Sequence, residues 1–258
     1  MYGFRLDVET HIITAGATSI QNLVKCIRSI GIDIDDLVLE PLASSEAVLT
    51  ADEKQVGVIL ADIGGGTTDI CVFKDGSIWH TAILPVAGYQ LTRDIAIGLG
   101  LPFEVAEEMK KRYGSVMPVY ESKMETANPI SEDGHGVSYQ DLCDIIRARV
   151  EEILRLILLE MPRSDYETMV PAGLVLTGGS SNLSGVETLG REVLKLPVRV
   201  GVPAHITGIT DAVHDPAYAT SVGLLLWGAK NEGSSRWNGG WLSSRFRQVA
   251  SKFRSLFR

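Results

Sequence analysis

The stretch VGVILADIGGGTTDICVFKDGSIWHTAILP, residues 56–85, decides the fold class. An apolar run is followed by three glycines, a second β-rich run, the turn Asp75-Gly76 and a third β-rich run. Apolar and β-branched runs separated by glycine turns are typical of neighbouring antiparallel strands. The stretch therefore predicts three strands joined by two tight connections.

The sequence on both sides alternates strand patterns with helix patterns. Apolar residues at helical spacing predict helices at 19–31, 90–112, 138–160 and 218–229, and another that begins near Pro41. Further strands are predicted by β-branched or apolar runs at 10–15, 36–39, 172–177 and 197–201. This alternation predicts an α/β fold.

The composition is that of an ordinary globular protein. The chain has 258 residues, 45% of them hydrophobic, and a formal net charge of -8. This acidic balance gives its body no general attraction to nucleic acid. Cys26, Cys71 and Cys143 have no metal-type spacing, and we predict buried thiols in a reducing compartment. We find no signal-peptide pattern and no apolar run of membrane-spanning length, and therefore expect a cytosolic protein unless something attaches it to a membrane.

Two glycine turns carry the sharpest chemical signal. ADIGGGTTD (61–69) and LTGGSSNLSGV (176–186) each follow an apolar strand pattern. Successive glycines let the backbone approach a ligand and point several N–H groups at a phosphate chain. A helix behind them offers further donors, and Asp62 at a strand end has the chemistry to hold a hydrated Mg²⁺. A single run of glycines between strands is more often a simple turn. Two such runs, each directly after an apolar strand pattern, are not needed for turns alone.

These motifs carry a resemblance to a known superfamily. DIGGGTTD, LTGGSSNLSGV and EPLASSEAVL (40–49) resemble the second phosphate loop, the adenosine loop and the first interdomain connector of the actin-like ATPases. Within that superfamily the chain is most similar to the FtsA family of bacterial cell-division proteins, through segments such as AEEMKKRYG, HITGITD and DPAYATSVGLLLWG. The similarity extends over essentially the whole chain and is least distinctive over 114–137. It implies an actin-like, ribonuclease H-like fold of two domains that close on a nucleotide.

The resemblance implies ATP and Mg²⁺ as cofactors and assigns residues to them. Asp62 would hold Mg²⁺ through water, and Glu40 would position a water near the γ-phosphate. The nucleotide itself would be held by Gly64, Gly65, Gly66, Thr67, Thr68, Glu107, Lys110, Gly178, Gly179 and Ser180. Glu107 and Lys110 also fit a plain intrahelical ion pair, and Glu40 also fits a local cap. Members of the FtsA family often lack an acid at the position of Glu40. Its presence here is compatible with slow ATP hydrolysis but is not evidence for it.

The resemblance also divides the chain into parts. The family pattern opens with another phosphate-binding hairpin and a small inserted subdomain, and neither precedes Met1. We therefore expect a fragment or truncated gene model without the N-terminal strands and the insert subdomain. The expected parts are the remainder of the first domain (1–52 with 205–228), the nucleotide-facing core of the second (53–110 with 171–204), its smaller subdomain (111–170) and a flexible linker (229–240).

In the FtsA family the smaller subdomain receives the tail of the tubulin-like protein FtsZ, an acidic peptide. Arg147 and Arg149, in DIIRARVEEIL (144–154), are candidates to meet its carboxylates. Pairing with Glu151 and Glu152 on a solvated helix face explains the same pattern equally well.

The last eighteen residues, WLSSRFRQVASKFRSLFR, have five cations and no acid. Winding them at about 100° per residue places one apolar arc of roughly 120° with basic residues around it. The arc consists of Leu242, Phe246, Val249, Ala250, Phe253, Leu256 and Phe257. That pattern is typical of a helix that lies in the surface of an anionic membrane, and the FtsA family ends in one. Docking onto the acidic body and binding in a partner's groove are the alternatives. The candidate membrane-binding residues are Trp241, Leu242, Arg245, Phe246, Arg247, Val249, Lys252, Phe253, Arg254, Leu256, Phe257 and Arg258.

The resemblance and the tail together predict a peripheral, ATP-binding adaptor on the cytoplasmic face of the bacterial inner membrane at midcell. It would anchor FtsZ filaments of the Z-ring, recruit later division proteins and associate with itself into actin-like filaments. It would be a scaffold more than an enzyme. Two alternatives come from the same superfamily, namely an actin-like pilus-assembly ATPase and an enzyme such as a sugar or acetate kinase.

Overall fold

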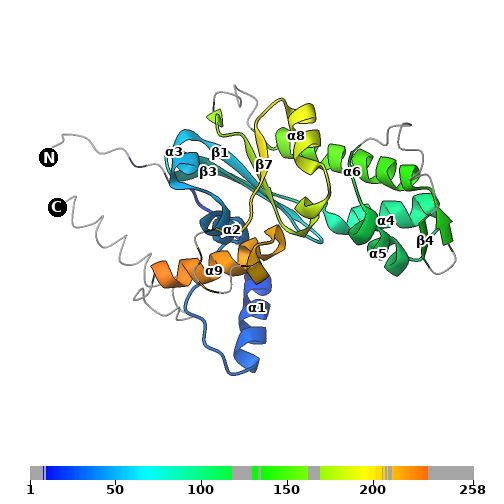
Figure 1. Ribbon diagram of the computed structural model, residues 1–258. Coiled ribbons are helices and arrows are strands. Elements are labelled where there is room, and N and C mark those ends of the chain that lie inside the picture. The colour runs from blue at the N-terminus through cyan, green and yellow to red at the C-terminus, as the bar shows by residue number, and fades with distance from the viewer. Residues whose placement is uncertain are drawn as a thin grey trace, which may run out of the picture. The chain divides into compact units, whose positions relative to one another are not determined.

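The computed structural model describes residues 8, 10–117, 130–132, 135–161, 169–204, 206, 208 and 211–231. Two units divide the chain: Glu40–Gly228, whose sheet and helices Figure 1 shows, and the pair of segments Met1–Leu39 and Ala229–Arg258. The predicted membrane-binding helix at 241–258 lies outside the described residues. No helix within the described ranges combines the length and the apolar character needed to cross a bilayer.

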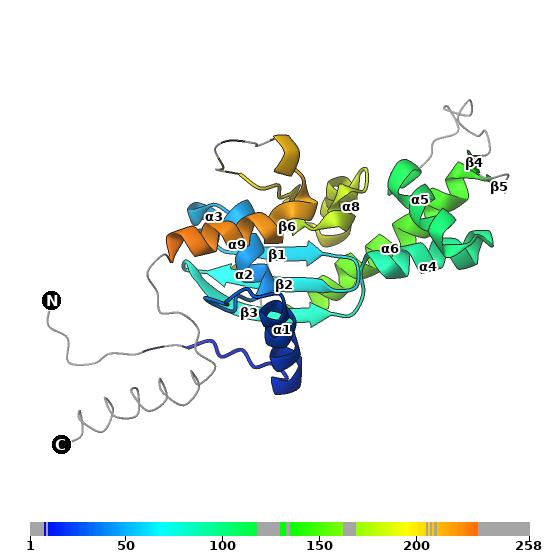
Figure 2. The same ribbon diagram turned by 90° about the horizontal axis from the view of Figure 1, so that it is seen from below.

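A five-stranded sheet forms the centre of the Glu40–Gly228 unit. The three strands predicted from residues 56–85 are present as β1 (Val58–Ile63), β2 (Thr68–Lys74) and β3 (Ser77–Leu84), each antiparallel to the next, and Figure 2 shows them side by side. On the other side of β1, β6 (Leu174–Thr177) and β7 (Val198–Val200) continue the sheet in parallel. The order is therefore β3-β2-β1-β6-β7.

One face of this sheet shares a core with α2 (Glu40–Val48) and α9 (Ala219–Lys230) (Figure 1). The strands contribute Leu60, Cys71 and Val175 to that core, all fully buried. The short helix α3 (Ala51–Val56) follows α2 and contacts β2.

The opposite face shares a core with α4 (Gly88–Leu99), α5 (Phe103–Tyr113), α6 (Tyr139–Leu159) and α8 (Val186–Leu194). Ile59, Ile70 and Leu176 point to this side, because neighbouring side chains on a strand alternate between the two faces. Figure 1 shows α4, α5 and α6 grouped together beyond the end of the sheet. A second, two-stranded sheet consists of β4 (Ile130–Glu132) and β5 (His135–Val137). The described residues of this unit also include short 3₁₀ turns at Gly179–Asn182, Asp211–Val213 and Pro216–Tyr218.

Several sequence predictions need correction. The helix predicted at 90–112 is two helices, because Gly100 takes a left-handed φ of 66° and Pro102 precedes α5. No strand is present at 10–15 or 36–39. A β-branched run becomes a strand only within a hydrogen-bonded ladder, and β-propensity alone does not provide one.

The cysteine prediction is confirmed for Cys71 and Cys143, which are buried, and wrong for Cys26, which is exposed. Burial raises the pKa of the Cys71 thiol to about 12. Cys26 lies on α1 (Ala17–Ser29), outside the apolar stripe that includes Val24. A helix buries only the residues on one stripe, and the position of Cys26 falls off it.

Candidate functional site

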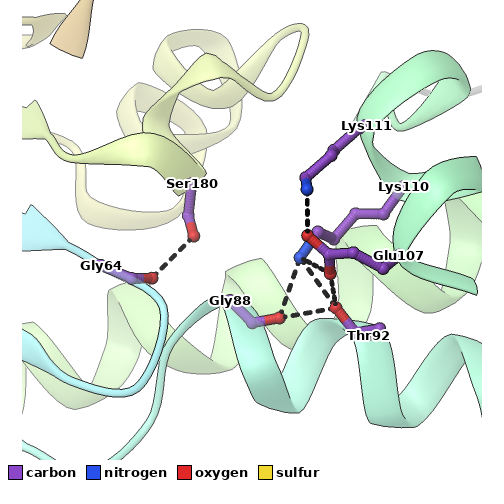
Figure 3. Close-up of polar contacts among 7 residues, drawn as sticks. All are labelled: Gly64, Gly88, Thr92, Glu107, Lys110, Lys111 and Ser180. Carbon is purple, nitrogen blue, oxygen red and sulfur yellow. Dashed lines mark hydrogen bonds and ion pairs between the residues drawn. The ribbon is translucent and has the colours of Figure 1, made fainter. Parts of the chain in front are cut away.

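The two glycine turns predicted from the sequence lie together in the structure. Gly64 follows β1 and Gly178 follows β6, and these neighbouring strands are parallel, so their carboxyl ends meet at one edge of the sheet. The hydroxyl of Ser180 donates a hydrogen bond of 3.0 Å to the carbonyl oxygen of Gly64 (Figure 3). This bond joins the turn of residues 64–66 to the turn of residues 178–180.

The start of α4 closes against the first turn. The backbone N–H of Gly88 donates to the Gly64 carbonyl at 3.1 Å, and that of Tyr89 donates to the Gly65 carbonyl at 2.6 Å. A Cβ atom on Gly88 would lie 2.9 Å from Oγ of Ser180, so a larger residue would disturb this junction. Three separate segments of chain therefore meet around the Gly64–Gly66 turn.

Glu107 and Lys110 on α5 form a network with α4 (Figure 3). Lys110 Nζ donates to a Glu107 carboxylate oxygen at 2.7 Å, to the Thr92 hydroxyl at 2.8 Å and to the Gly88 carbonyl at 3.1 Å. The Thr92 hydroxyl contacts the same Glu107 oxygen, and Lys111 pairs with the other at 3.2 Å. The predicted intrahelical pair is thus part of a structure that links two helices.

The Glu107 carboxyl is held in its ionised form. Partial burial alone would raise its pKa, but hydrogen bonds from Lys110 and Thr92 and the Lys110 charge outweigh burial and lower the pKa to about 2. A permanently ionised carboxylate at the rim of a cavity is a good acceptor for ligand hydroxyl groups.

These elements enclose a cavity of about 700 Å³, within the range of small-molecule sites. Glycine backbone lines one side, and α4 and α5 supply the aromatic rings of Tyr89 and Phe103, whose centroids are 5.3 Å apart. The predicted nucleotide-binding residues that line the cavity are Gly64, Gly65, Gly66, Glu107, Lys110, Gly179 and Ser180.

The two predicted threonines make contacts within the chain. The Thr68 side chain is fully buried, and its hydroxyl donates to the Val86 carbonyl at 2.7 Å. The Thr67 hydroxyl donates to Asp69 at 2.9 Å. Neither threonine is among the residues that line the cavity.

Asp62 is buried at the end of β1, with 4% of its surface exposed. It is close enough to two further acids, Glu40 at the start of α2 and Asp69 on β2, to affect their ionisation. The pKa of Glu40 is raised by desolvation and by the charges of Asp69 and Asp62. The pKa of Asp69 is raised by desolvation and by the charge of Asp62, although a hydrogen bond from Thr67 partly lowers it. Among the residues that the structure describes, no three His, Cys, Asp or Glu side chains are arranged to hold a metal ion directly, so a cation near Asp62 would have to be held through water.

Arg147 and Arg149 of α6 already have partners. Arg147 donates to the Val116 carbonyl at 2.9 Å and to Glu192 at 3.0 Å. Arg149 pairs with Asp94 of α4 and Glu152 of its own helix. The predicted pairing with Glu152 is present, and Glu151 pairs with Arg155 instead.

Sequence reasoning missed several residues of the site. Gly88 and Thr92 of α4 support the Lys110 network, and Ser44 and Thr220 donate to Asp62. Ser44 lies within the connector motif of residues 40–49, which marked the segment but not the role of that hydroxyl.

The fold is that of the actin-like proteins, and a glycine-lined cavity lies at the carboxyl ends of β1 and β6. Solved structures support the fold: MreB5 of Spiroplasma citri bound to ADP has a TM-score of 0.66 at 16% identity over 84% of this chain and 66% of that one. The MamK double helical filament has a TM-score of 0.61 at 20% identity, over 83% and 66%. A PilM-PilN type IV pilus biogenesis complex has a TM-score of 0.59 at 20% identity, over 81% and 57%.

The model of the family described as cell division protein FtsA matches residues 59–223. The chain belongs to the FtsA family, as its motifs predicted. It is 44% identical to FtsA of Pseudomonas aeruginosa over 90% of this chain and 56% of the relative. It is 41% identical to FtsA of Bacillus subtilis over 90% of this chain and 52% of the relative. It is 40% identical to FtsA of Neisseria meningitidis over 91% of this chain and 58% of the relative. The chain therefore spans a little over half the length of the curated relatives it matches.

Proposed function

We propose that the chain binds ATP with Mg²⁺ in the glycine-lined cavity. The observation that carries this proposal is the meeting of two glycine turns and the Glu107–Lys110 network around one cavity of about 700 Å³. The backbone of Gly64–Gly66 would hold the phosphates, and Thr67 and Thr68 would fix that turn through their bonds to Asp69 and the Val86 carbonyl. The turn of residues 178–180 would line the adenosine.

The remaining residues would act on the ribose, the metal and water. Glu107 would accept hydrogen bonds from ribose hydroxyls, and Lys110 would keep that carboxylate ionised and oriented. Asp62 would hold Mg²⁺ through water, and the bound ion would neutralise phosphate charge. Glu40, whose pKa is raised, would orient a water near the terminal phosphate.

Nucleotide binding by the 258-residue chain tests this part directly. We expect a fluorescent ATP analogue to bind the unmodified chain, and Glu107→Gln and Lys110→Met to weaken binding by roughly tenfold or more, the value of one lost charge-assisted contact. Lys74→Met, at the exposed end of β2, is a matched control that should bind as the unmodified chain does. Equal affinity in all four proteins would overturn the proposed site.

We further propose a role in bacterial cell division, as a membrane-tethered adaptor that anchors FtsZ filaments and recruits later division proteins. Membership of the FtsA family and the basic, apolar tail at 241–258 support this role. Self-association into filaments is part of the proposal, and the fold likeness to a MamK filament is compatible with it. The place of action would be the cytoplasmic face of the inner membrane at midcell.

The FtsZ interaction would use Arg147 and Arg149 in competition with their present partners. An FtsZ tail peptide would have to replace Glu192 at Arg147, so Arg147→Ala should weaken peptide binding and Glu192→Gln should strengthen it. Arg155→Ala, on the same helix and 65% exposed, is the control. If no variant changes peptide affinity, α6 is not the FtsZ site. If no FtsZ peptide binds at all, the proposed anchoring of FtsZ filaments is overturned.

A further inference from the structure

Asp62 is held by two hydroxyl groups from helices that are distant in sequence. Ser44 of α2 donates to Asp62 Oδ2 at 2.6 Å, and Thr220 of α9 donates to the same oxygen at 3.0 Å. The two hydroxyl oxygens are 2.9 Å apart. Ser44 is fully buried and Asp62 nearly so, and therefore these contacts have little competition from solvent.

The geometry leaves the two carboxylate oxygens in different situations. Each hydroxyl has one hydrogen, so Ser44 and Thr220 can both donate to Oδ2 only if neither donates to the other. Oδ1 faces Gly178, where a Cβ atom would lie only 2.4 Å away. The hydroxyl pair therefore anchors Oδ2 and fixes the direction in which Oδ1 points.

We infer that Ser44 and Thr220 are positioning residues that orient the Asp62 carboxylate toward the metal of a bound nucleotide. This inference rests on the proposed function, because it assigns these two hydroxyls to the nucleotide site. Groups that orient a metal-binding carboxylate commonly change metal affinity by about ten- to a hundredfold when removed. The bond from Thr220 also ties α9, at the far end of the unit in sequence, to the end of β1.

The test uses the whole 258-residue chain and the variants Ser44→Ala, Thr220→Val and Thr220→Ser. Thr220→Val keeps the branched shape and removes the hydroxyl, whereas Thr220→Ser keeps the hydroxyl and removes a methyl group. ATP affinity is measured with excess Mg²⁺ and again with EDTA, and the ratio of the two dissociation constants reports the benefit of Mg²⁺. Urea unfolding of each variant shows that it is folded under both conditions.

We expect Ser44→Ala and Thr220→Val to reduce the Mg²⁺ benefit by roughly tenfold or more, with the EDTA affinity changed by less than about twofold. Thr220→Ser should keep most of the benefit. The inference is overturned if the unmodified chain shows a Mg²⁺ benefit and both hydroxyl-free variants keep it, or if Thr220→Ser loses as much as Thr220→Val. Failure of the unmodified chain to bind ATP under either condition would instead overturn the proposed function, and the inference with it. Should Ser44→Ala not fold, the two Thr220 variants decide alone.

Discussion

At Glu107, burial raises the pKa of the carboxyl and the neighbouring groups lower it, and the neighbouring groups have the larger effect. Its folded pKa of about 2 lies below the ordinary value of 4.5. The ionised form therefore stabilises the fold above the ordinary pKa, and this contribution is lost as the pH falls toward 2. We expect Glu107→Gln to lower the free energy of unfolding by about 1 kcal/mol at pH 7, with the difference shrinking between about pH 5 and pH 2.

Chemical denaturation across that pH range measures the effect. Glu108→Gln is the matched control, because Glu108 is the next residue of α5 and forms an exposed pair with Arg112. Exposed pairs contribute little, so this control should change stability by less than about 0.5 kcal/mol. A Glu107→Gln difference that stays constant from pH 7 to pH 2 would contradict the role of ionisation.

The glycines of the two turns differ in what a methyl group would meet. Gly178 has a φ of 83°, and a Cβ atom there would collide with Asp62 and the Ile63 carbonyl, whereas Gly65 has open space around it. Gly178→Ala should therefore destabilise the fold by about 3 kcal/mol or more. Gly65→Ala should change stability by less than about 1 kcal/mol but weaken ATP binding, because Gly65 lines the cavity. Urea denaturation and analogue binding measure the two effects, and the reverse order of stability would be inconsistent with this geometry.

Which site residues the sequence could predict depends on how far their partners lie along the chain. Gly64 and Asp62 belong to one short motif after one strand, so turn chemistry and a strand end are enough to suggest them. Thr220 acts on Asp62 across 158 residues. A hydroxyl group has no local signature that reveals a partner so distant, and only the crossing of helices over the sheet brings the two together.

At the scale of secondary-structure elements, α2 and α9 meet at a backbone contact. A Cβ atom on Gly223 would lie 1.8 Å from the Ala43 carbonyl oxygen, so the absence of a side chain sets how closely the helices approach. Gly223→Ala should destabilise the fold by about 3 kcal/mol or more. Gly228→Ala, on the same helix with nothing within 4 Å of the new methyl group, should instead stabilise it by about 0.5–1 kcal/mol. Thermal and urea unfolding compare the two, and equal effects would argue against this close approach.

Elements whose partners are adjacent in sequence were the ones that pattern reasoning predicted well. Strands β1, β2 and β3 follow one another and pair in that order, so alternation and turn residues suffice. The single helix predicted at 90–112 is wrong, because Gly100 and Pro102 divide it into α4 and α5 without ending the apolar periodicity. The run at 10–15 has the residues of a strand but no ladder in the structure.

At the scale of the whole chain, the sequence motifs were enough to identify the family but not to locate the boundaries between its domains. FtsA membership is confirmed by the family match over residues 59–223. The proposed boundaries within the second domain stay predictions. Buried side chains of β1, α4, α6 and α8 belong to one continuous core, and a continuous core gives no composition change at which a boundary could be read.

The tail at 241–258 decides whether the proposed adaptor reaches a membrane. Co-sedimentation should show the whole chain pelleting with vesicles that contain anionic lipid, and a chain ending at residue 240 remaining in solution. The double variant Phe246→Glu and Phe253→Glu keeps all five cations but places charge in the apolar arc, so it should lose most of the binding. Binding of the whole chain should also weaken as salt rises, because each cation near the surface contributes on the order of 1 kcal/mol that salt screens. Equal pelleting of the whole and shortened chains would exclude the tail as the membrane anchor.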